Sequence, residues 1–393
     1  MIPYGRQSIS QADIDTVVEV LRSDFLTQGP WVARFEKRVA EACAAQYAVG
    51  VNSATSALHI ACMALDLGPG DWLWTSPTTF VASANSARFC GAEVDFVDID
   101  PRTYNMCPDA LEEKLALAAK NGRLPKVVMP VHLCGQPCDM ARIGALSKQY
   151  GFKVIEDASH AIGASYSADG KEDTFEPVGN CRYSDITVFS FHPVKIITTA
   201  EGGMALTNDA LMANRLQRLR SHGITSDPAE MQPRPTDEIW NYQQIRLGYN
   251  YRMTDLQAAL GVSQMERLSA FVEQRHRVAH RYDTALADLP LQLPWQSPSS
   301  YSSYHLYPIR VNAQTGGVSQ RQLYDLLQAG KINVNLHYIP VYRHPYYEAM
   351  GFKRGYCPQA EAYYKEALSI PMYPTLSEAE QDHVIEVLRR AFA

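Results

Sequence analysis

Short apolar runs rich in β-branched residues alternate with longer amphipathic stretches along the first half of this chain. The runs predict strands at 47–51, 72–75, 93–97, 126–131, 152–156, 186–191 and 204–207. The stretches between them predict helices, among them 57–65, 108–120, 139–149 and 209–222. Strands that alternate with helices of this length form a mostly parallel sheet covered on both faces. The sequence therefore predicts an α/β fold.

The chain has 393 residues, which is too many for a single hydrophobic core. We expect a large domain at 1–245 and a smaller C-terminal α/β domain at 246–393, bridged by one long helix at 255–286. Further elements expected in the smaller domain are strands at 304–311 and 333–338 and helices at 318–329 and 376–392. Residues 164–184 and 223–243 are predicted to be a surface excursion and a long loop.

The net charge of −6 argues against a nucleic-acid or anionic membrane partner, because both require a basic surface. No apolar run approaches the ~18 residues of a membrane span, and the start lacks the apolar core of a signal peptide. We therefore expect a cytoplasmic protein with no membrane partner. Three residues separate Cys134 from Cys138, rather than the two of a typical metal-binding pair, and no second pair matches them, so no metal site is predicted.

Lys195 lies on a turn just after the predicted strand 186–191, which Pro193 ends because proline lacks an N–H group. A second apolar strand follows the pair Gly202-Gly203. A lysine held between two buried strands is costly while charged, so its pKa should be depressed or its amine consumed covalently. Both conditions suit an amine that forms a Schiff base. The alternative is a lysine that extends from a strand edge into solvent.

Upstream, the apolar strand at 152–156 runs directly into Asp157, and His160 follows three residues later. Open α/β sheets place ligand contacts at the carboxyl ends of their strands. Pyridoxal 5′-phosphate (PLP) needs a lysine for its aldehyde and a carboxylate that keeps its ring nitrogen protonated. We predict Lys195, Asp157 and His160 as catalytic and cofactor-binding residues, although a structural role for His160 stays open.

Small hydroxyl residues at 52–56 stand between a predicted strand and a predicted helix. The free N–H groups at a helix start, together with the helix dipole, favour an anion. Taken alone, the pattern is more typical of simple N-capping by serine or threonine. Combined with Lys195 and Asp157, it predicts a phosphate site formed by Thr55, Ser56 and the hydroxyl of Ser190.

Six segments occur in an order that makes the chain recognisable: NSATSAL (52–58), SPTTFVASAN (76–85), EDASHAIG (156–163), SFHPVKIITTAEGG (190–203), RSHG (220–223) and GYNYRMTDLQAALG (248–261). In these the chain resembles the DegT/DnrJ/EryC1/StrS sugar aminotransferases. The resemblance implies a PLP-dependent transferase of fold type I, which is aspartate-aminotransferase-like. Within the family the chain is most similar to the branch of pseudaminic acid biosynthesis, through LTQG (26–29), ITTAEGG (197–203) and HLYPI (305–309).

That resemblance implies transfer of an amino group from L-glutamate to C4 of a UDP-4-keto-6-deoxy-N-acetylhexosamine. It implies that Phe80 stacks on the cofactor ring and that Asn250 reaches the phosphate of a neighbouring subunit, so a homodimer would share its active sites. The residues implied in substrate binding are Tyr4, Asp24, Phe25, Leu26, Thr27, Ala54 and Ser190. Many relatives have glycine where this chain has Ala200, which is either a mark of the branch or a change that tunes the lysine turn.

Several alternatives stay open at this point. The acceptor could be another nucleotide sugar aminated at C4 or C3, as for bacillosamine, aminoarabinose or antibiotic sugars. A PLP-binding sugar dehydratase or a regulatory relative is a more remote reading, and Lys195 argues against the dehydratase branch, which carries histidine there. A dinucleotide-dependent dehydrogenase would need a G-x-G-x-x-G segment after a strand, which the chain lacks. Further candidates near the expected cleft are His192, His305, Tyr307, the stretch 335–338 and Arg343.

Overall fold

The structure, a computed structural model, describes residues 1–171, 174–235, 238, 241–311 and 317–393. A seven-stranded sheet forms its centre, in the order β1 (Tyr47–Val51), β9 (Gly203–Thr207), β8 (Ile186–Ser190), β5 (Lys153–Asp157), β4 (Val127–Met129), β2 (Trp72–Thr75) and β3 (Glu93–Phe96). The five strands from β8 to β3 run parallel, and β9 runs antiparallel to both β1 and β8. The prediction of a mostly parallel α/β sheet is confirmed.

Helices cover both faces of this sheet, because its central strands are apolar on both sides. In β8, Ile186 and Val188 pack into one core and Phe189 into another. The first core includes α3 (Ala54–Ala64), α4 (Ala82–Phe89) and α7 (Ala210–Leu219). The opposite face is covered by α2 (Pro30–Cys43) and α8 (Asp255–Met265), by α1 (Gln11–Leu21), which packs on α8, and by α5 (Pro108–Lys120) and α6 (Met140–Tyr150).

The C-terminal part has its own core, formed by three antiparallel strands and three helices. Its members are α9 (Leu268–Ala285), β12 (Leu291–Gln292), β14 (Tyr307–Val311), α11 (Gln320–Ala329), β15 (Ala367–Ile370) and α14 (Glu378–Ala391). The strand predicted at 333–338 is absent, and Asn335 makes only an isolated bridge to Ser369 of β15. That edge of the sheet is formed instead by β15, which pairs with β14.

The single helix predicted at 255–286 is two helices, α8 and α9, separated at Glu266 and Arg267. Arg267 leaves the helical conformation with φ of −110° and ψ of 7°, and its guanidinium pairs with buried Asp13 of α1. The break lets α8 pack on α1 and α2 while α9 joins the C-terminal core. Tertiary contacts thus divide a stretch whose apolar periodicity is continuous.

Residues after 340 return to the large sheet through η3 (Val341–Arg343), α12 (Pro345–Glu348) and α13 (Pro358–Glu366). Tyr342 and Tyr347 pack against Phe96 of β3, and Tyr363 packs against Tyr104. The chain beyond residue 245 therefore contributes both to a core of the large sheet and to the C-terminal core. A domain boundary near residue 245 stays a prediction.

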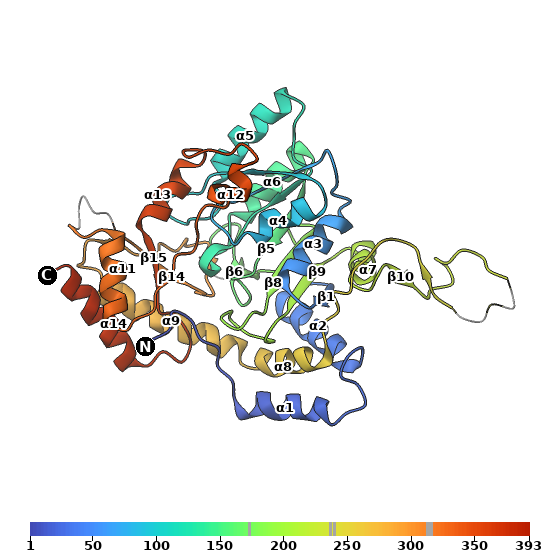
Figure 1. Cartoon of the computed structure of the whole chain (residues 1–393), viewed down its shortest axis with the longest axis horizontal. Helices are drawn as coiled ribbons and strands as arrows, with labels where there is room; N and C mark the ends of the chain where they lie inside the picture. Colours follow the sequence, from blue (N-terminus) through green and yellow to red (C-terminus); the bar gives the residue numbers. More distant parts are fainter. Residues whose placement is uncertain (172–173, 236–237, 239–240, 312–316) are drawn as a thin grey trace.

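Shorter elements complete the described chain. They are η1 (Leu133–Gly135), β6 (Ser165–Tyr166), β7 (Glu176–Pro177), β13 (Ser300–Tyr301), β10 (Ile224–Thr225) and β11 (Gln243–Gln244). The predicted excursion 164–184 pairs β6 with β7 and β13, and the predicted loop 223–243 is an arm that extends from the body (Figure 1). Each also includes some residues outside the described ranges. In the described parts of the chain, no helix is both long and apolar enough to cross a bilayer.

Candidate active site

A cavity of about 540 Å³ opens where β5, β8 and the start of α3 meet. It lies at the carboxyl ends of parallel strands, where α/β sheets bind their ligands. Its walls include eight residues predicted from the sequence: Tyr4, Ala54, Thr55, Phe80, Asp157, His160, Ser190 and Lys195. Residues more than 300 positions apart, from Tyr4 to Tyr338, thus meet in one cavity.

Lys195 reaches this cavity from a turn that backbone bonds hold in place. Its N–H donates to the carbonyl of His192 at 2.9 Å, and the hydroxyl of Thr198 donates to the carbonyl of Phe191 at 3.1 Å. Ala200 closes the turn with φ of 65°, a left-handed conformation that favours glycine. Burial lowers the pKa of the Lys195 amine from 10.5 to about 8, although Asp157 and Cys134 act in the opposite direction.

This pKa predicts how the amine reacts with pH. With a pKa of about 8, the neutral and therefore nucleophilic fraction rises from about a tenth at pH 7 to about nine-tenths at pH 9. Labelling of Lys195 by an amine-selective acylating reagent in cofactor-free protein, followed by peptide mass spectrometry, should show a midpoint near pH 8. Exposed Lys148 in the same digest supplies the reference curve. A midpoint for Lys195 near 10.5 would contradict the prediction.

Asp157 is the last residue of β5, and its carboxylate is buried with 4% of the residue exposed. One oxygen accepts a hydrogen bond of 2.6 Å from the hydroxyl of Ser83, and the other accepts one of 2.6 Å from Ser159. Neither serine was predicted from the sequence. Ser159 stands two positions after Asp157, and Ser83 stands three positions after Phe80, so their spacing from predicted site residues could have indicated them.

His160 is held at both ring nitrogens. Its Nδ1 accepts the backbone N–H of Cys134 at 3.2 Å, so a neutral ring carries its hydrogen on Nε2, 3.2 Å from the hydroxyl oxygen of Tyr338. Burial, and then Lys195 and His337, hold the pKa of His160 well below its ordinary 6.5. Since the Tyr338 oxygen accepts from His160, its own hydrogen is available to a ligand in the cavity.

The start of α3 forms the floor where an anion would bind. Ser53 is the N-cap, and its hydroxyl accepts the N–H of Ser56 at 3.1 Å, which leaves the N–H groups of Ala54 and Thr55 at the positive helix end. Gly203 of β9 permits this approach, because a Cβ there would lie 2.6 Å from the nitrogen of Ala54. This turn can therefore serve both predicted roles: Ser53 caps the helix, and the N–H groups of Ala54 and Thr55 remain open to an anion.

Other predicted residues do not line the cavity. Ser56 turns inward, and its hydroxyl donates to Asn52 at 2.7 Å. Asn250 and the whole segment 24–27 are exposed, and Thr27 forms a bridge with Thr254 at the start of α8. Of the further candidates, His192, His305, Asn335, Leu336, His337 and Tyr338 line the cavity, whereas Tyr307 is buried in the C-terminal core and Arg343 pairs with Glu348.

The residues that meet in the cavity fit PLP. An amine of depressed pKa, a buried carboxylate, an aromatic ring at Phe80 and the open N-terminus of α3 face one space. They match, in turn, the aldehyde, the ring nitrogen, the ring face and the phosphate of that cofactor. In the described ranges, no cluster of three or more histidine, cysteine or acidic side chains is arranged to hold a metal ion.

Residues 7–389 match the sequence profile of the DegT/DnrJ/EryC1/StrS aminotransferase family. The chain belongs to this family. It is 38% identical to the spore coat polysaccharide biosynthesis protein SpsC of Bacillus subtilis, over 99% of this chain and 96% of the relative. It is 34% identical to the UDP-4-amino-4,6-dideoxy-N-acetyl-beta-L-altrosamine transaminase of Campylobacter jejuni, again over 99% and 96%.

Solved structures agree with this assignment. Helicobacter pylori PseC, an aminotransferase involved in pseudaminic acid biosynthesis, superposes with a TM-score of 0.88 at 27% identity over 100% of this chain and 99% of PseC. The PLP form of the putative sugar aminotransferase Spr1654 of Streptococcus pneumoniae gives 0.86 at 30% identity over 100% of both chains. The predicted family, fold type and cofactor are confirmed: this is a PLP-dependent sugar aminotransferase.

Proposed function

We propose that this aminotransferase moves an amino group from L-glutamate to C4 of a UDP-4-keto-6-deoxy-N-acetylhexosamine, in the biosynthesis of pseudaminic acid. The observation that carries the proposal is the meeting of the Lys195 amine and the Asp157 carboxylate in one 540 Å³ cavity of a sugar aminotransferase. Similarity to the altrosamine transaminase and to PseC supports this choice of acceptor. A cytoplasmic location stays a prediction.

The roles of the cavity residues follow from their contacts. PLP, when bound, would supply an electron sink for the donor's Cα. Lys195 would hold the aldehyde end of the cofactor, and its Nζ would move the Cα proton. Asp157, oriented by Ser83 and Ser159, would hold the proton of the ring nitrogen. The N–H groups of Ala54 and Thr55, with the Thr55 and Ser190 hydroxyls, would hold the phosphate.

Charge supports a homodimer with shared sites. Lys195 is the one lysine or arginine among the described residues that line the cavity, yet a cofactor phosphate and a nucleoside diphosphate both need positive or N–H partners. Asn250 and segment 24–27 are exposed, and the Thr27–Thr254 bridge joins the two regions. We propose that this face of one subunit completes the cavity of its partner, as the sequence resemblance implies.

A second acceptor is favoured by one observation. The chain is more similar to SpsC, at 38% identity, than to the altrosamine transaminase, at 34%. A sugar destined for a surface polysaccharide is therefore the alternative substrate, with the same chemistry at the cavity.

The deciding experiment is incubation of the purified holoenzyme with L-glutamate and a panel of nucleotide-linked 3-keto and 4-keto sugars. Mass spectrometry detects the amino sugar, and NMR gives the position and configuration of the new amine. Amination of the UDP-4-keto-6-deoxy-N-acetylhexosamine at C4, well above the other sugars, is the expected result. Preference for a thymidine-linked or 3-keto sugar would overturn the choice of substrate and leave the aminotransferase assignment in place.

Phe80 gives a test of cofactor stacking. The residue is 60% exposed and lines the cavity, so its ring is accessible to a ligand bound there. Aromatic stacking contributes about 0.5–1.5 kcal/mol, so Phe80→Ala should weaken PLP binding about 2- to 12-fold. Phe80→Tyr should retain wild-type affinity, and equal affinity of the alanine variant in a fluorescence titration would refute the stacking.

A further inference from the structure

Asp157 has a buried neighbour, Glu156, that points the other way. Successive side chains of a strand face opposite sides of the sheet, so Asp157 faces the cavity and Glu156 faces the helices α5 and α6. We propose that the buried pair Glu156–His132 positions the active site: it fixes Asp157 and His160 relative to each other from the opposite face of the sheet. The inference rests on the proposed role of Asp157.

Three side chains donate to the Glu156 carboxylate. His132 Nε2 lies 2.7 Å away, the hydroxyl of Thr187 donates at 2.9 Å, and the hydroxyl of Ser184 makes the third bond. Burial alone would raise the pKa of Glu156, but these hydrogen bonds outweigh it and hold that pKa below the ordinary 4.5. A carboxylate with 1% exposure cannot exchange these partners for water, so its geometry is narrowly defined.

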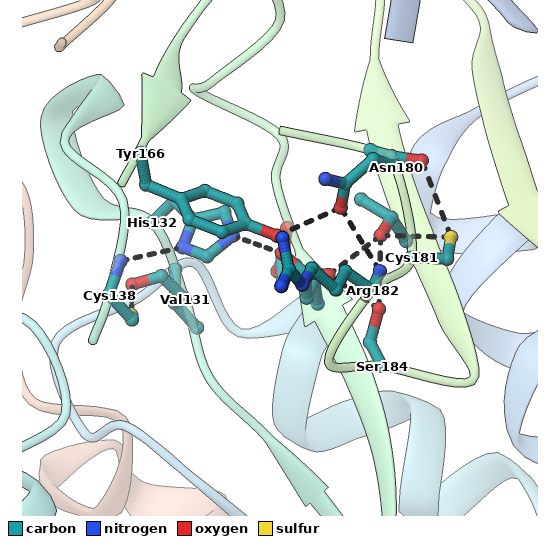
Figure 2. Close-up of polar contacts among 12 residues, drawn as sticks. Val131, His132, Cys138, Tyr166, Asn180, Cys181, Arg182 and Ser184 are labelled. Carbon is teal, nitrogen blue, oxygen red and sulfur yellow. Dashed lines mark hydrogen bonds and ion pairs between the residues drawn. The ribbon is translucent and has the colours of Figure 1, made fainter. Parts of the chain in front are cut away.

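His132 is fixed just as tightly. Burial lowers the pKa of His132, but Cys138 and the Glu156 carboxylate outweigh it and raise that pKa to about 10. The hydrogen bonds nevertheless require a neutral ring, because Nδ1 accepts the backbone N–H of Cys138 at 3.0 Å and can carry no hydrogen of its own. The one ring hydrogen therefore lies on Nε2 and points to Glu156. Figure 2 shows the His132 ring beside Cys138, with Ser184 on the other side of the same group of polar contacts. Around the carboxylate, burial and the Glu156 charge raise the pKa of the Cys181 thiol to about 12 and raise that of Tyr166, so both stay protonated.

The same residue connects this cluster to the cavity. The backbone N–H of His132 donates to the carbonyl of Asp157 at 3.1 Å, and the N–H of Asp157 donates to the carbonyl of Pro130 at 2.9 Å. Two residues further on, in η1, the N–H of Cys134 donates to His160. His132 therefore joins Glu156 through its side chain, Asp157 through its backbone and His160 through the turn that follows.

This arrangement explains how a buried charge on the far side of the sheet serves the reaction. A displacement of about 1 Å in a catalytic group costs roughly 10²-fold in rate. Its three partners lie in the loop after β4, in β8 and just before β8, so Glu156 restrains the end of β5 that carries Asp157. No part of the cluster touches the cavity, so Glu156 and His132 are positioning residues and have no direct contact with a ligand.

The test uses holoenzyme variants. Glu156→Gln keeps the shape and removes the charge, and it should lower kcat about 10- to 100-fold with less than about a 3-fold change in the KM of the sugar. It should also shift the pH titration of the bound cofactor's visible absorbance, because the Asp157 carboxylate would be displaced from the ring nitrogen whose proton it holds. Ser184→Ala removes one donor of three, and a smaller loss of about 2- to 12-fold is expected. Should Glu156→Gln fail to fold, Ser184→Ala carries the same readouts.

Glu176→Gln is the matched control, because Glu176 pairs with Arg182 at the outer edge of the same region and has no bond to Asp157. It should leave the absorbance titration and kcat unchanged. If Glu156→Gln or Ser184→Ala melts earlier but keeps the wild-type titration and kcat, the cluster only stabilises the fold and the inference is overturned. Asp157→Asn is titrated alongside: if that variant shows no shift, the proposed role of Asp157 fails instead.

Discussion

Replacement of Lys195 by alanine should reduce transamination at least about 10⁴-fold. The amine has two proposed tasks, covalent attachment of the cofactor and movement of the donor's proton, and acid–base catalysis alone contributes about 10²–10⁴-fold. The variant should also lose the visible absorbance that purified holoenzyme shows when PLP is bound to a lysine. Multiple-turnover assays with glutamate and the keto sugar, together with an absorbance scan, measure both effects.

Folding should survive this change. Lys195 is half-buried with a depressed pKa, so it contributes little that alanine would remove from the folded state. Lys153→Ala is the control, because Lys153 begins β5 and pairs with Asp185 at the surface end of the strand. An unchanged visible band in the Lys195 variant would mean that another amine carries the cofactor.

Asp157→Asn should lower kcat about 10²–10³-fold, the usual cost of removing one preorganised electrostatic group from a buried site. The amide has nearly the same shape as the carboxylate. Ser83 and Ser159 donate to different oxygens of Asp157, so in the variant one hydroxyl still donates to the amide oxygen and the other turns to accept from the NH₂ group. What the variant lacks is the negative charge, which in a site with 4% exposure is screened weakly by water. The ring nitrogen of bound PLP then loses its proton more easily, and the cofactor accepts electrons less well.

Measuring both kcat and the PLP content shows whether the activity lost in Asp157→Asn comes from slower chemistry or from loss of the cofactor. The asparagine variant should still bind PLP through Lys195, and its loss should appear in kcat and in the pH dependence of the absorbance. Asp109→Asn provides the surface control, since Asp109 pairs with Arg142 in an exposed position. A wild-type kcat in the asparagine variant would show that Asp157 has no role in the reaction and that another acidic group holds the proton of the ring nitrogen.

Local sequence signals were sufficient where a single strand or turn decides the outcome. The β-branched run at 186–191 followed by Pro193 placed Lys195 on a turn after a strand, and the structure has β8 ending at Ser190. The apolar strand that leads into Asp157 was equally clear, because its last carboxylate breaks the run. Both signals depend on neighbours in the chain, so no long-range contact was needed to recognise them.

Predictions from local sequence were wrong where contacts between distant segments decide the structure. The apolar periodicity of 255–286 continues through residue 266, yet Arg267 turns to Asp13 and the helix divides. The strand expected at 333–338 was replaced by β15, which pairs with β14 from beyond residue 366. Neither outcome is encoded in a local pattern, because each depends on which partner a segment finds across the fold.

By itself the sequence determined the order of strands and helices in the first half of the chain, the lysine and the carboxylate of the site, and the family to which they belong, since those depend on residue type and local spacing. Only the tertiary structure decided what surrounds them. The serines that hold Asp157, the Cys134–His160–Tyr338 chain and the Glu156–His132 pair come from separate elements. Their hydrogen bonds exist because burial excludes water and leaves each polar group one set of partners, a condition that arises only when the chain has packed.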